Sequence, residues 1–349
     1  MEAAKINKQT DRTVYFDYLR VFAIFAVMIL HISAQNWYTT DVNSFEWQVF
    51  NFFDSIVRWG VPVFVMISGS LFLGREIPLK KMYSKYILRM VISFFVWSFI
   101  YAISMGGNIV SELLIGHYHM WFILMIIGIY MCMPFIKPIV ETDTRIKYYL
   151  ILAFVFAFVV PEVTTLINDF GSELFMKGGD LINDTVDKMS IHSVLGYASY
   201  FVLGYYINKI DLSKRQRAII YILGILGFAF TIMMDLIVAL KTQKACLNYY
   251  NYFTVNVLFE AIAVFTWFKY KEYNRYGLNL LIQRLSKYSF GAYLVHALVI
   301  EQLNIHFGLN TLSFHSVFAV ICIGVLVFTI SFVISAILNK VPIVKKYMV

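Results

Sequence analysis

The segment that decides the fold runs from Tyr15 to His31 and reads Tyr-Phe-Asp-Tyr-Leu-Arg-Val-Phe-Ala-Ile-Phe-Ala-Val-Met-Ile-Leu-His. It has the length and apolar character of a bilayer span, yet it contains Asp17, Arg20 and His31. Ionisable side chains inside a span are costly and are functional candidates by default. Eleven residues make about three helical turns, so Arg20 and His31 share one face, about 16 Å apart along the axis. This segment predicts a membrane helix with a cation near one surface and a possible base deep in the bilayer.

Further apolar segments follow along the whole chain, so the first one is expected to be a retained helix and not a signal peptide. Hydrophobic residues make up 60% of the 349 residues and charged residues only 14%, a composition that excludes a soluble domain. We predict an all-α, polytopic membrane protein with one domain over residues 1–349 and short cytoplasmic tails at about 1–13 and 340–349. The ten predicted spans are 14–34, 50–73, 86–105, 119–139, 148–167, 192–208, 217–240, 249–268, 289–307 and 314–339.

The basic residues alternate between the connections on the two sides of these spans. One set of connections, which includes both termini, carries 21 Lys and Arg, whereas the other set carries only Lys177, Lys188, Lys241 and Lys244. Because cytoplasmic loops are enriched in Lys and Arg, both termini are predicted to be cytoplasmic. The net charge of +8 is therefore a topology signal, and a nucleic-acid partner is not expected.

Polar residues inside the predicted spans each have a structural and a functional interpretation. His31 is a packing residue or a catalyst, and Arg20 pairs with Asp17 or helps to hold an anionic ligand that enters from the cytoplasm. Arg58 and Glu260 are intramembrane ions that pair or line a cavity. The remaining candidates are His119 and Trp121, which could belong to an interface belt, and Tyr293 and His296. Glu301 lies about 140° around the helix from His296, which argues against a dyad of these two residues.

The sequence lacks the motifs of several common enzyme and transporter classes. The sequence contains no Walker A or Rossmann glycine motif, no H-E-x-x-H and no G-x-S-x-G, which argues against an ATP-driven pump subunit, a zincin and an α/β-hydrolase. Cys132, Cys246 and Cys322 are scattered, so neither a disulfide framework nor a metal site is expected.

Four segments, taken in order, resemble motifs of acyltransferase family 3, and in particular its branch that O-acetylates bacterial surface polysaccharides. The segments are Asp17-x-Leu19-Arg20 followed by His31, Gly60 to Gly69, His119-Met-Trp121-Phe122, and Ser289 to His296. They occur in order and are spread across nearly the whole chain. One departure is that the family's paired Arg-x-x-Arg after the second helix is represented by Lys85 and Arg89, with Tyr86 in the first Arg position.

The resemblance implies a multi-pass protein of the bacterial cytoplasmic membrane. It implies acetyl-CoA, or another acyl-CoA, as the cytoplasmic co-substrate, and a cell-surface or lipid-linked glycan as acceptor on the other side. His31 would be the catalytic residue and Arg20 part of the donor site, with Lys85 and Arg89 as further CoA contacts. The candidate substrate contacts are Asp17, Arg58, His119, Trp121, Glu260, Tyr293 and His296.

Two other classes of function stay open from the sequence. The first is a secondary transporter or flippase for a lipid-linked sugar or small metabolite, which would use the intramembrane charges as its path. Inverted repeats would favour that class, and none is evident in the sequence. The second is a non-catalytic membrane partner, for which His31→Ala would be silent. The sequence leaves open the acceptor, the acyl group and the oligomeric state.

Overall fold

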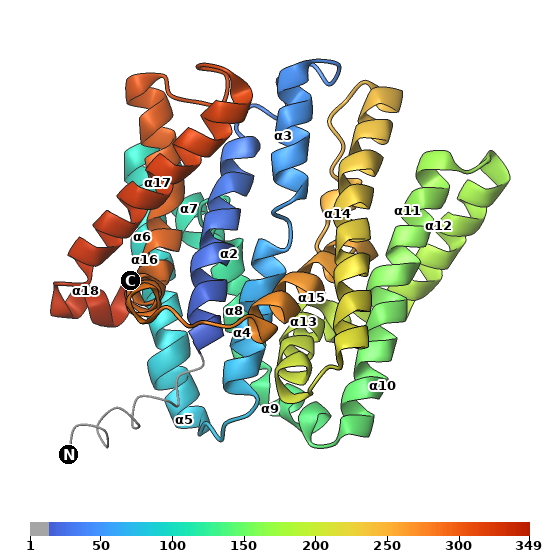
Figure 1. The fold of residues 1–349 in the computed structure, drawn as a ribbon, viewed down its shortest axis with the longest axis horizontal. Coiled ribbons are helices and arrows are strands. Elements are labelled where there is room, and N and C mark those ends of the chain that lie inside the picture. The colour runs from blue at the N-terminus through green and yellow to red at the C-terminus, as the bar shows by residue number, and fades with distance from the viewer. Residues whose placement is uncertain (1–13) are drawn as a thin grey trace.

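The computed structural model describes residues 14–349, except for the side chains of His192 and Ser193. The predicted tail at about 1–13 lies outside the described residues. From residue 14 onward the chain forms helices and connecting segments, with no strand (Figure 1). The all-α prediction is confirmed. Helices suit such an apolar chain because they satisfy every backbone hydrogen bond within one segment.

The helices follow one another along the chain with short connections. The first half contains α2 (Val14–Ser33), α3 (Phe45–Ser55), α4 (Gly60–Phe72), α5 (Leu79–Lys81), η2 (Met82–Ile87), α6 (Leu88–Met105), α7 (Ile109–Ile115), α8 (Trp121–Met131), α9 (Met133–Ile136), η3 (Lys137–Val140), α10 (Asp143–Ala153), η4 (Phe154–Val159) and α11 (Val160–Phe170). The second half contains α12 (Glu173–Lys188), α13 (His192–Lys209), α14 (Lys214–Thr242), η5 (Asn248–Tyr250), α15 (Val255–Tyr270), α16 (Tyr276–Phe307), α17 (Ser316–Leu338) and α18 (Pro342–Tyr347).

Seven helical segments in the described chain are long and apolar enough to cross a membrane. An eighth arises if α8 and the α9–η3 segment, which meet at a bend of 58°, form one broken span. The predicted spans 192–208 and 289–307 correspond to α13 and α16, which are helical but are not among these seven segments. The count of ten and the cytoplasmic position of both termini therefore stay predictions.

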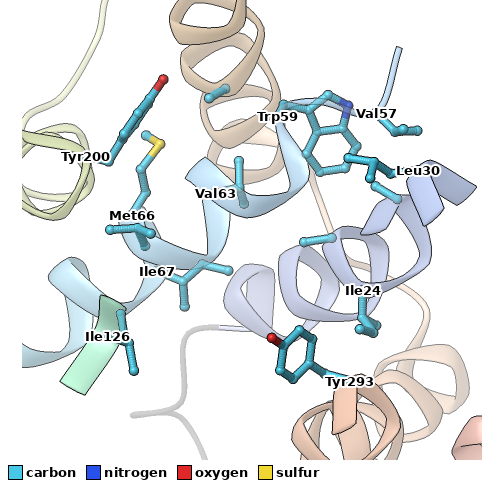
Figure 2. Packing of buried hydrophobic residues seen from close by; sticks show 14 of the residues in the cluster. Ile24, Leu30, Val57, Trp59, Val63, Met66, Ile67, Ile126, Tyr200 and Tyr293 are labelled. Atoms are coloured by element: carbon cyan, nitrogen blue, oxygen red, sulfur yellow. The ribbon is translucent and has the colours of Figure 1, made fainter. Parts of the chain in front are cut away.

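Helix α2 lies inside the bundle and is packed against α3, α4, α16 and α17 (Figure 1). Figure 2 shows Ile24 of α2 near Tyr293 of α16, and Val63 and Ile67 on the neighbouring α4. Ile24 and Val63 are fully buried. This packing fixes the position of the helix that carries Arg20 and His31.

Two glycines let α4 and α13 touch through their backbones. A Cβ atom on Gly69 would overlap the main-chain oxygen of Phe201, and a Cβ atom on Gly204 would overlap that of Met66. Small residues permit such close approach between membrane helices. Gly69 belongs to the second of the four resembling segments, so part of that motif has a packing role.

Candidate functional site

His31 lies in the last turn of α2. It is seventeen residues from Val14, which corresponds to a rise of about 26 Å. His31 is therefore near the far end of its helix and not in its middle, and its depth in the bilayer stays a prediction. The end of the bundle that carries His31 also carries the connection from residue 34 to residue 44. By the basic-residue pattern this is the predicted outer end.

Three histidines meet at this end. The ring centroids of His31 and His296 are 5.2 Å apart, those of His119 and His296 are 5.0 Å apart, and those of His31 and His119 are 6.5 Å apart. His119 precedes α8, and His296 lies within α16. The structure thus brings together three predicted site residues from three separate elements. No three His, Cys, Asp or Glu side chains in the described part of the chain are arranged to hold a metal ion.

The orientation of His296 follows from its hydrogen bond. Its Nδ1 lies 2.5 Å from the main-chain oxygen of Tyr293. A carbonyl oxygen only accepts, so Nδ1 donates and carries the proton. The Nε2 atom of His296 is buried and has no hydrogen-bond partner within residues 14–349. The Tyr293 hydroxyl donates to the main-chain oxygen of His119 at 2.5 Å. This hydrogen bond ties α16 to the turn before α8, and a substrate contact of Tyr293 stays a prediction.

Tyr101 of α6 also positions the histidines, although the sequence analysis did not single it out. Its hydroxyl donates to the main-chain oxygen of Leu294 at 2.8 Å and accepts from the amide of Leu298 at 2.9 Å. These two groups are four residues apart, as in an α-helical hydrogen bond, so the hydroxyl bridges them beside His296. The Tyr101 ring stacks on His117, with 4.3 Å between centroids and 8° between planes.

His117 and Glu301 form a pair that the sequence analysis missed. The Nε2 atom of His117 lies 2.8 Å from Oε1 of Glu301. The helical angle correctly separated Glu301 from His296, but the turn before α8 supplies a different histidine. The available signal was His117 itself, two residues before His119. Helical periodicity predicts pairs within one helix only. This pair joins α16 to the turn before α8.

A cavity of about 360 Å³ adjoins His31 on the predicted outer side. The residues that line it are mostly polar: His31, Ala34, Gln35, Asn36, Tyr118, Ile300, Glu301, Asn304 and Asn310. Gln35, Asn36 and Asn310 lie in connections between the predicted spans, so a search for polar residues inside the membrane could not find them. His31 is therefore accessible from a polar space.

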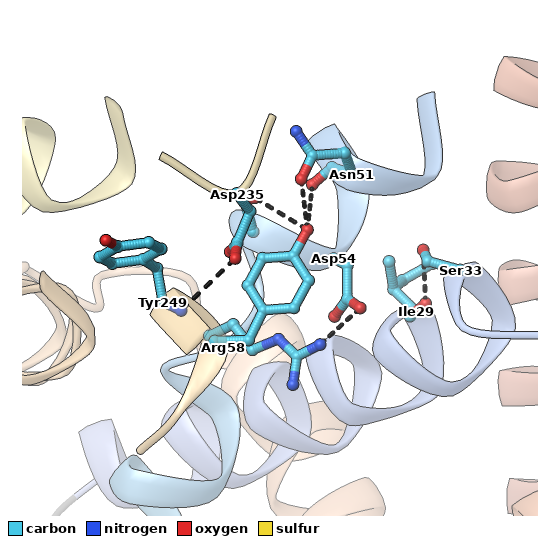
Figure 3. A network of polar contacts seen from close by, with 9 residues as sticks. Ile29, Ser33, Asn51, Asp54, Arg58, Asp235 and Tyr249 are labelled. Carbon is cyan, nitrogen blue, oxygen red and sulfur yellow. Dashed lines mark hydrogen bonds and ion pairs between the residues drawn. The ribbon is translucent and has the colours of Figure 1, made fainter. Parts of the chain in front are cut away.

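Arg58 and Glu260 do not pair with each other. Arg58 binds Asp54, with 2.5 Å between Nη2 and Oδ2, and lies over the ring of Tyr250 at 4.0 Å (Figure 3). Glu260 is fully buried and accepts a hydrogen bond from Thr231 at 2.7 Å. The expectation of a structural ion pair is met for Arg58, with Asp54 as the partner.

Trp121 lies against two tyrosines. Its ring is 5.7 Å from Tyr197 and 5.9 Å from Tyr252, in the latter case stacked at 28°. These rings belong to α13 and to the connection before α15. Trp121 is therefore next to the histidines in sequence, but its ring packs with a separate aromatic group.

The basic candidates lie toward the opposite, predicted cytoplasmic end. Arg20 lies 3.9 Å from Asp17, and 29% of its side chain is exposed whereas Asp17 is buried. Lys85 lies 5.8 Å over the ring of Tyr86. Arg89 donates to the main-chain oxygen of Val349. The local Asp17–Arg20 contact is thus present, and Arg89 holds a segment of this chain in the structure.

Comparison with known protein families gives a match over nearly the whole chain. Residues 13–336 match the acyltransferase domain of acyltransferase family 3. The chain belongs to this family. Together with the apolar helices, this membership identifies a multi-pass membrane acyltransferase. Comparisons with curated proteins and with solved structures found no match.

Proposed function

We propose that this family member transfers an acyl group, acetyl in the first instance, from cytoplasmic acyl-CoA to a hydroxyl of a cell-surface or lipid-linked glycan. His31 acts as general base or as transient acyl carrier. The observation that carries the proposal is the position of His31, beside two other histidines and a polar cavity. The family match favours this function over a transporter.

The two ends of α2 suit the two substrates. Arg20, at the predicted cytoplasmic end, is partly exposed and could contact the phosphates of CoA, for which guanidinium groups are well suited. CoA carries its thioester at the end of a long thin arm. The rise of about 16 Å from Arg20 to His31 is comparable to the reach of that arm. The acceptor would approach His31 from the polar cavity.

In the direct route, His31 accepts the proton of the acceptor hydroxyl. The hydroxyl oxygen forms a bond to the thioester carbonyl carbon, the carbon–sulfur bond breaks, and the thiolate leaves with that proton as the CoA thiol. In the two-step route, His31 first takes the acyl group while its ring proton leaves with the CoA thiolate. The acceptor oxygen then takes the acyl group, and the hydroxyl proton returns to His31.

The test uses purified protein, radiolabelled acetyl-CoA and a glycan acceptor fraction. His31→Gln keeps hydrogen bonding but does not take up a proton at this site, so transfer should fall by about 10²–10⁴-fold, while CoA binding and melting temperature stay near wild type. His306→Gln, an exposed histidine on α16, is the matched control and should retain activity. Near-normal transfer by His31→Gln would contradict the catalytic role.

A further inference from the structure

We propose that the cavity beside His31 is an acceptor subsite for a neutral sugar. In this subsite Gln35 and Glu301 accept hydrogen bonds from hydroxyl groups that flank the hydroxyl to be acylated. The inference rests on the proposed acyl transfer and adds to it the acceptor class and the two residues that recognise it. It is carried by two unsatisfied buried oxygen atoms that belong to residues lining the cavity.

Two residues that line the cavity hold buried oxygen atoms without a partner in the described chain. They are Gln35, through Oε1, and Glu301, through Oε2. Buried polar atoms are nearly always hydrogen-bonded, and an unmade bond is costly. Both atoms belong to side chains of the same polar cavity as His31, so a donor placed there could satisfy them after a small side-chain rotation.

The three asparagines of the wall are already engaged. Asn36 donates to Thr311 at 2.8 Å and to Asn310 at 3.3 Å, and Asn310 donates to Asn304 at 3.0 Å. These amides connect the ends of α2 and α16 to the turn before α17, and they form a framework around the cavity. The second oxygen of Glu301, Oε1, is held by His117.

The unsatisfied atoms define the ligand chemistry. A carboxylate accepts hydrogen bonds and cannot donate them, so the ligand must supply O–H or N–H donors at this position. A sugar supplies hydroxyl donors on neighbouring carbons. The negative charge of Glu301 would repel a uronic acid or a phosphate placed beside it, which is a repulsive element of specificity. A volume of about 360 Å³ is within the usual range of small-molecule sites.

The experiment compares three classes of probe on the purified full chain. The methyl β-glycosides of glucose, galactose and N-acetylglucosamine carry flanking hydroxyls. Tetrahydropyran-2-methanol keeps the ring and the primary hydroxyl but lacks the flanking hydroxyls. Methyl glucuronide keeps the flanking ring hydroxyls but has a carboxylate in place of the primary hydroxymethyl group. Saturation-transfer NMR measures binding, and CoA release from acetyl-CoA measures transfer. Gln35→Leu is the test variant, and Gln48→Leu, an exposed glutamine on α3, is the matched control.

Wild-type protein and Gln48→Leu should bind at least one methyl glycoside more tightly than tetrahydropyran-2-methanol or methyl glucuronide. Gln35→Leu should weaken glycoside binding by roughly two- to twelvefold, the effect of one neutral hydrogen bond. It should leave acetyl-CoA binding unchanged and remove most of the preference over tetrahydropyran-2-methanol.

Three results would overturn the inference. They are no binding of any methyl glycoside to wild type, tighter binding of methyl glucuronide, or an equal loss for the glycoside and tetrahydropyran-2-methanol in Gln35→Leu. Failure of the proposed function would be distinct, because glycoside binding would then persist without CoA release. Partial recovery of the glycoside preference in Gln35→Glu, which restores an acceptor oxygen, would support recognition over a purely structural role.

Discussion

The polar side chains of two regions of the bundle have different surroundings. The first region is the Asp54–Arg58 network, and the second is the histidine cluster of His31, His119 and His296. In the network, the guanidinium of Arg58 has a carboxylate at 2.5 Å and an aromatic face at 4.0 Å (Figure 3). In the cluster, the Nε2 atom of His296 has no hydrogen-bond partner among residues 14–349, and His31 lines a polar cavity. The network pairs its two charges with each other, whereas His31 of the cluster adjoins a polar cavity.

The difference shows that an ionisable residue in a membrane segment does not by itself identify a site. Arg58 and His31 are both costly in the bilayer and are therefore equal candidates in the sequence. What separates them is the partner. Asp54 compensates the charge of Arg58 four residues away on the chain, and the polar space beside His31 could accept a ligand.

The largest expected effect is a difference in cysteine labelling between the two ends of the bundle. In intact cells one end should be labelled and the other should not. Tyr38 is 71% exposed, and Lys80 is exposed at the opposite end. In a background without Cys132, Cys246 and Cys322, Tyr38→Cys should react with a membrane-impermeant maleimide in intact cells. Lys80→Cys should react only after the cells are opened.

This labelling pattern follows from the positive-inside rule, and it would place the cavity beside His31 outside. Labelling of Lys80→Cys in intact cells, with Tyr38→Cys protected, would contradict the predicted orientation and support the opposite one. The acceptor would then have to come from the cytoplasm.

The next largest effect is on stability, at the ion pair. Arg58→Ala leaves Asp54 buried without its counter-charge, which should cost about 3–5 kcal/mol of unfolding free energy. The double variant Asp54→Leu/Arg58→Met removes both charges and should recover most of the melting temperature. Arg145→Ala removes an exposed pair with Glu141 and should change the melting temperature little.

The readout for the ion pair is thermal unfolding in detergent. If Arg58 instead served the substrate, Arg58→Ala would lower transfer without a loss of melting temperature, and the double variant would stay inactive. That outcome would show that Arg58 has a functional role, as proposed for the histidine cluster, and not only a structural one.

A smaller effect is expected at the donor end. Arg20→Ala should weaken acyl-CoA binding by roughly ten- to a hundredfold, because a charge-assisted contact to phosphate contributes about 1.5–3 kcal/mol. Arg20→Lys keeps the charge and should lose less. Unchanged CoA affinity in folded Arg20→Ala would mean that the contact with Asp17 is the only role of Arg20.

The sequence predicted the fold class and most helices because apolar length and helix formation are local properties. It predicted His31, His119 and His296 as candidates, but it could not predict that their rings lie within 6.5 Å of one another. That proximity depends on how α2, α16 and the turn before α8 pack. Arg89 shows the same limit, because its contact with Val349 joins residues far apart in the chain.

The cavity residues were missed for a different reason. Polar residues stand out in the sequence only inside the membrane spans, where they are costly. In the connections between the spans polar residues are common, so these positions do not stand out. Gln35 and Asn310 lie in such connections, and only the fold brings them to the cavity that His31 also lines. Glu301 differs from His296 in helical angle, and its partner His117 comes from outside α16.

The smallest expected effect concerns Tyr101, whose hydroxyl bridges Leu294 and Leu298 beside His296. Tyr101→Phe keeps the ring that stacks on His117 and removes only the hydroxyl. The two backbone groups can then bond to each other, so the unfolding free energy should fall by no more than about 0.5–1.5 kcal/mol. The transfer rate should fall by a few-fold at most, since the bridge only positions the histidines, and CoA affinity should not change. Tyr148→Phe, an exposed tyrosine of α10, controls for loss of a hydroxyl. A loss of transfer rate as large as that of His31→Gln, at unchanged melting temperature, would contradict this role. It would show that the Tyr101 hydroxyl takes part in the reaction itself and does not only position the histidines.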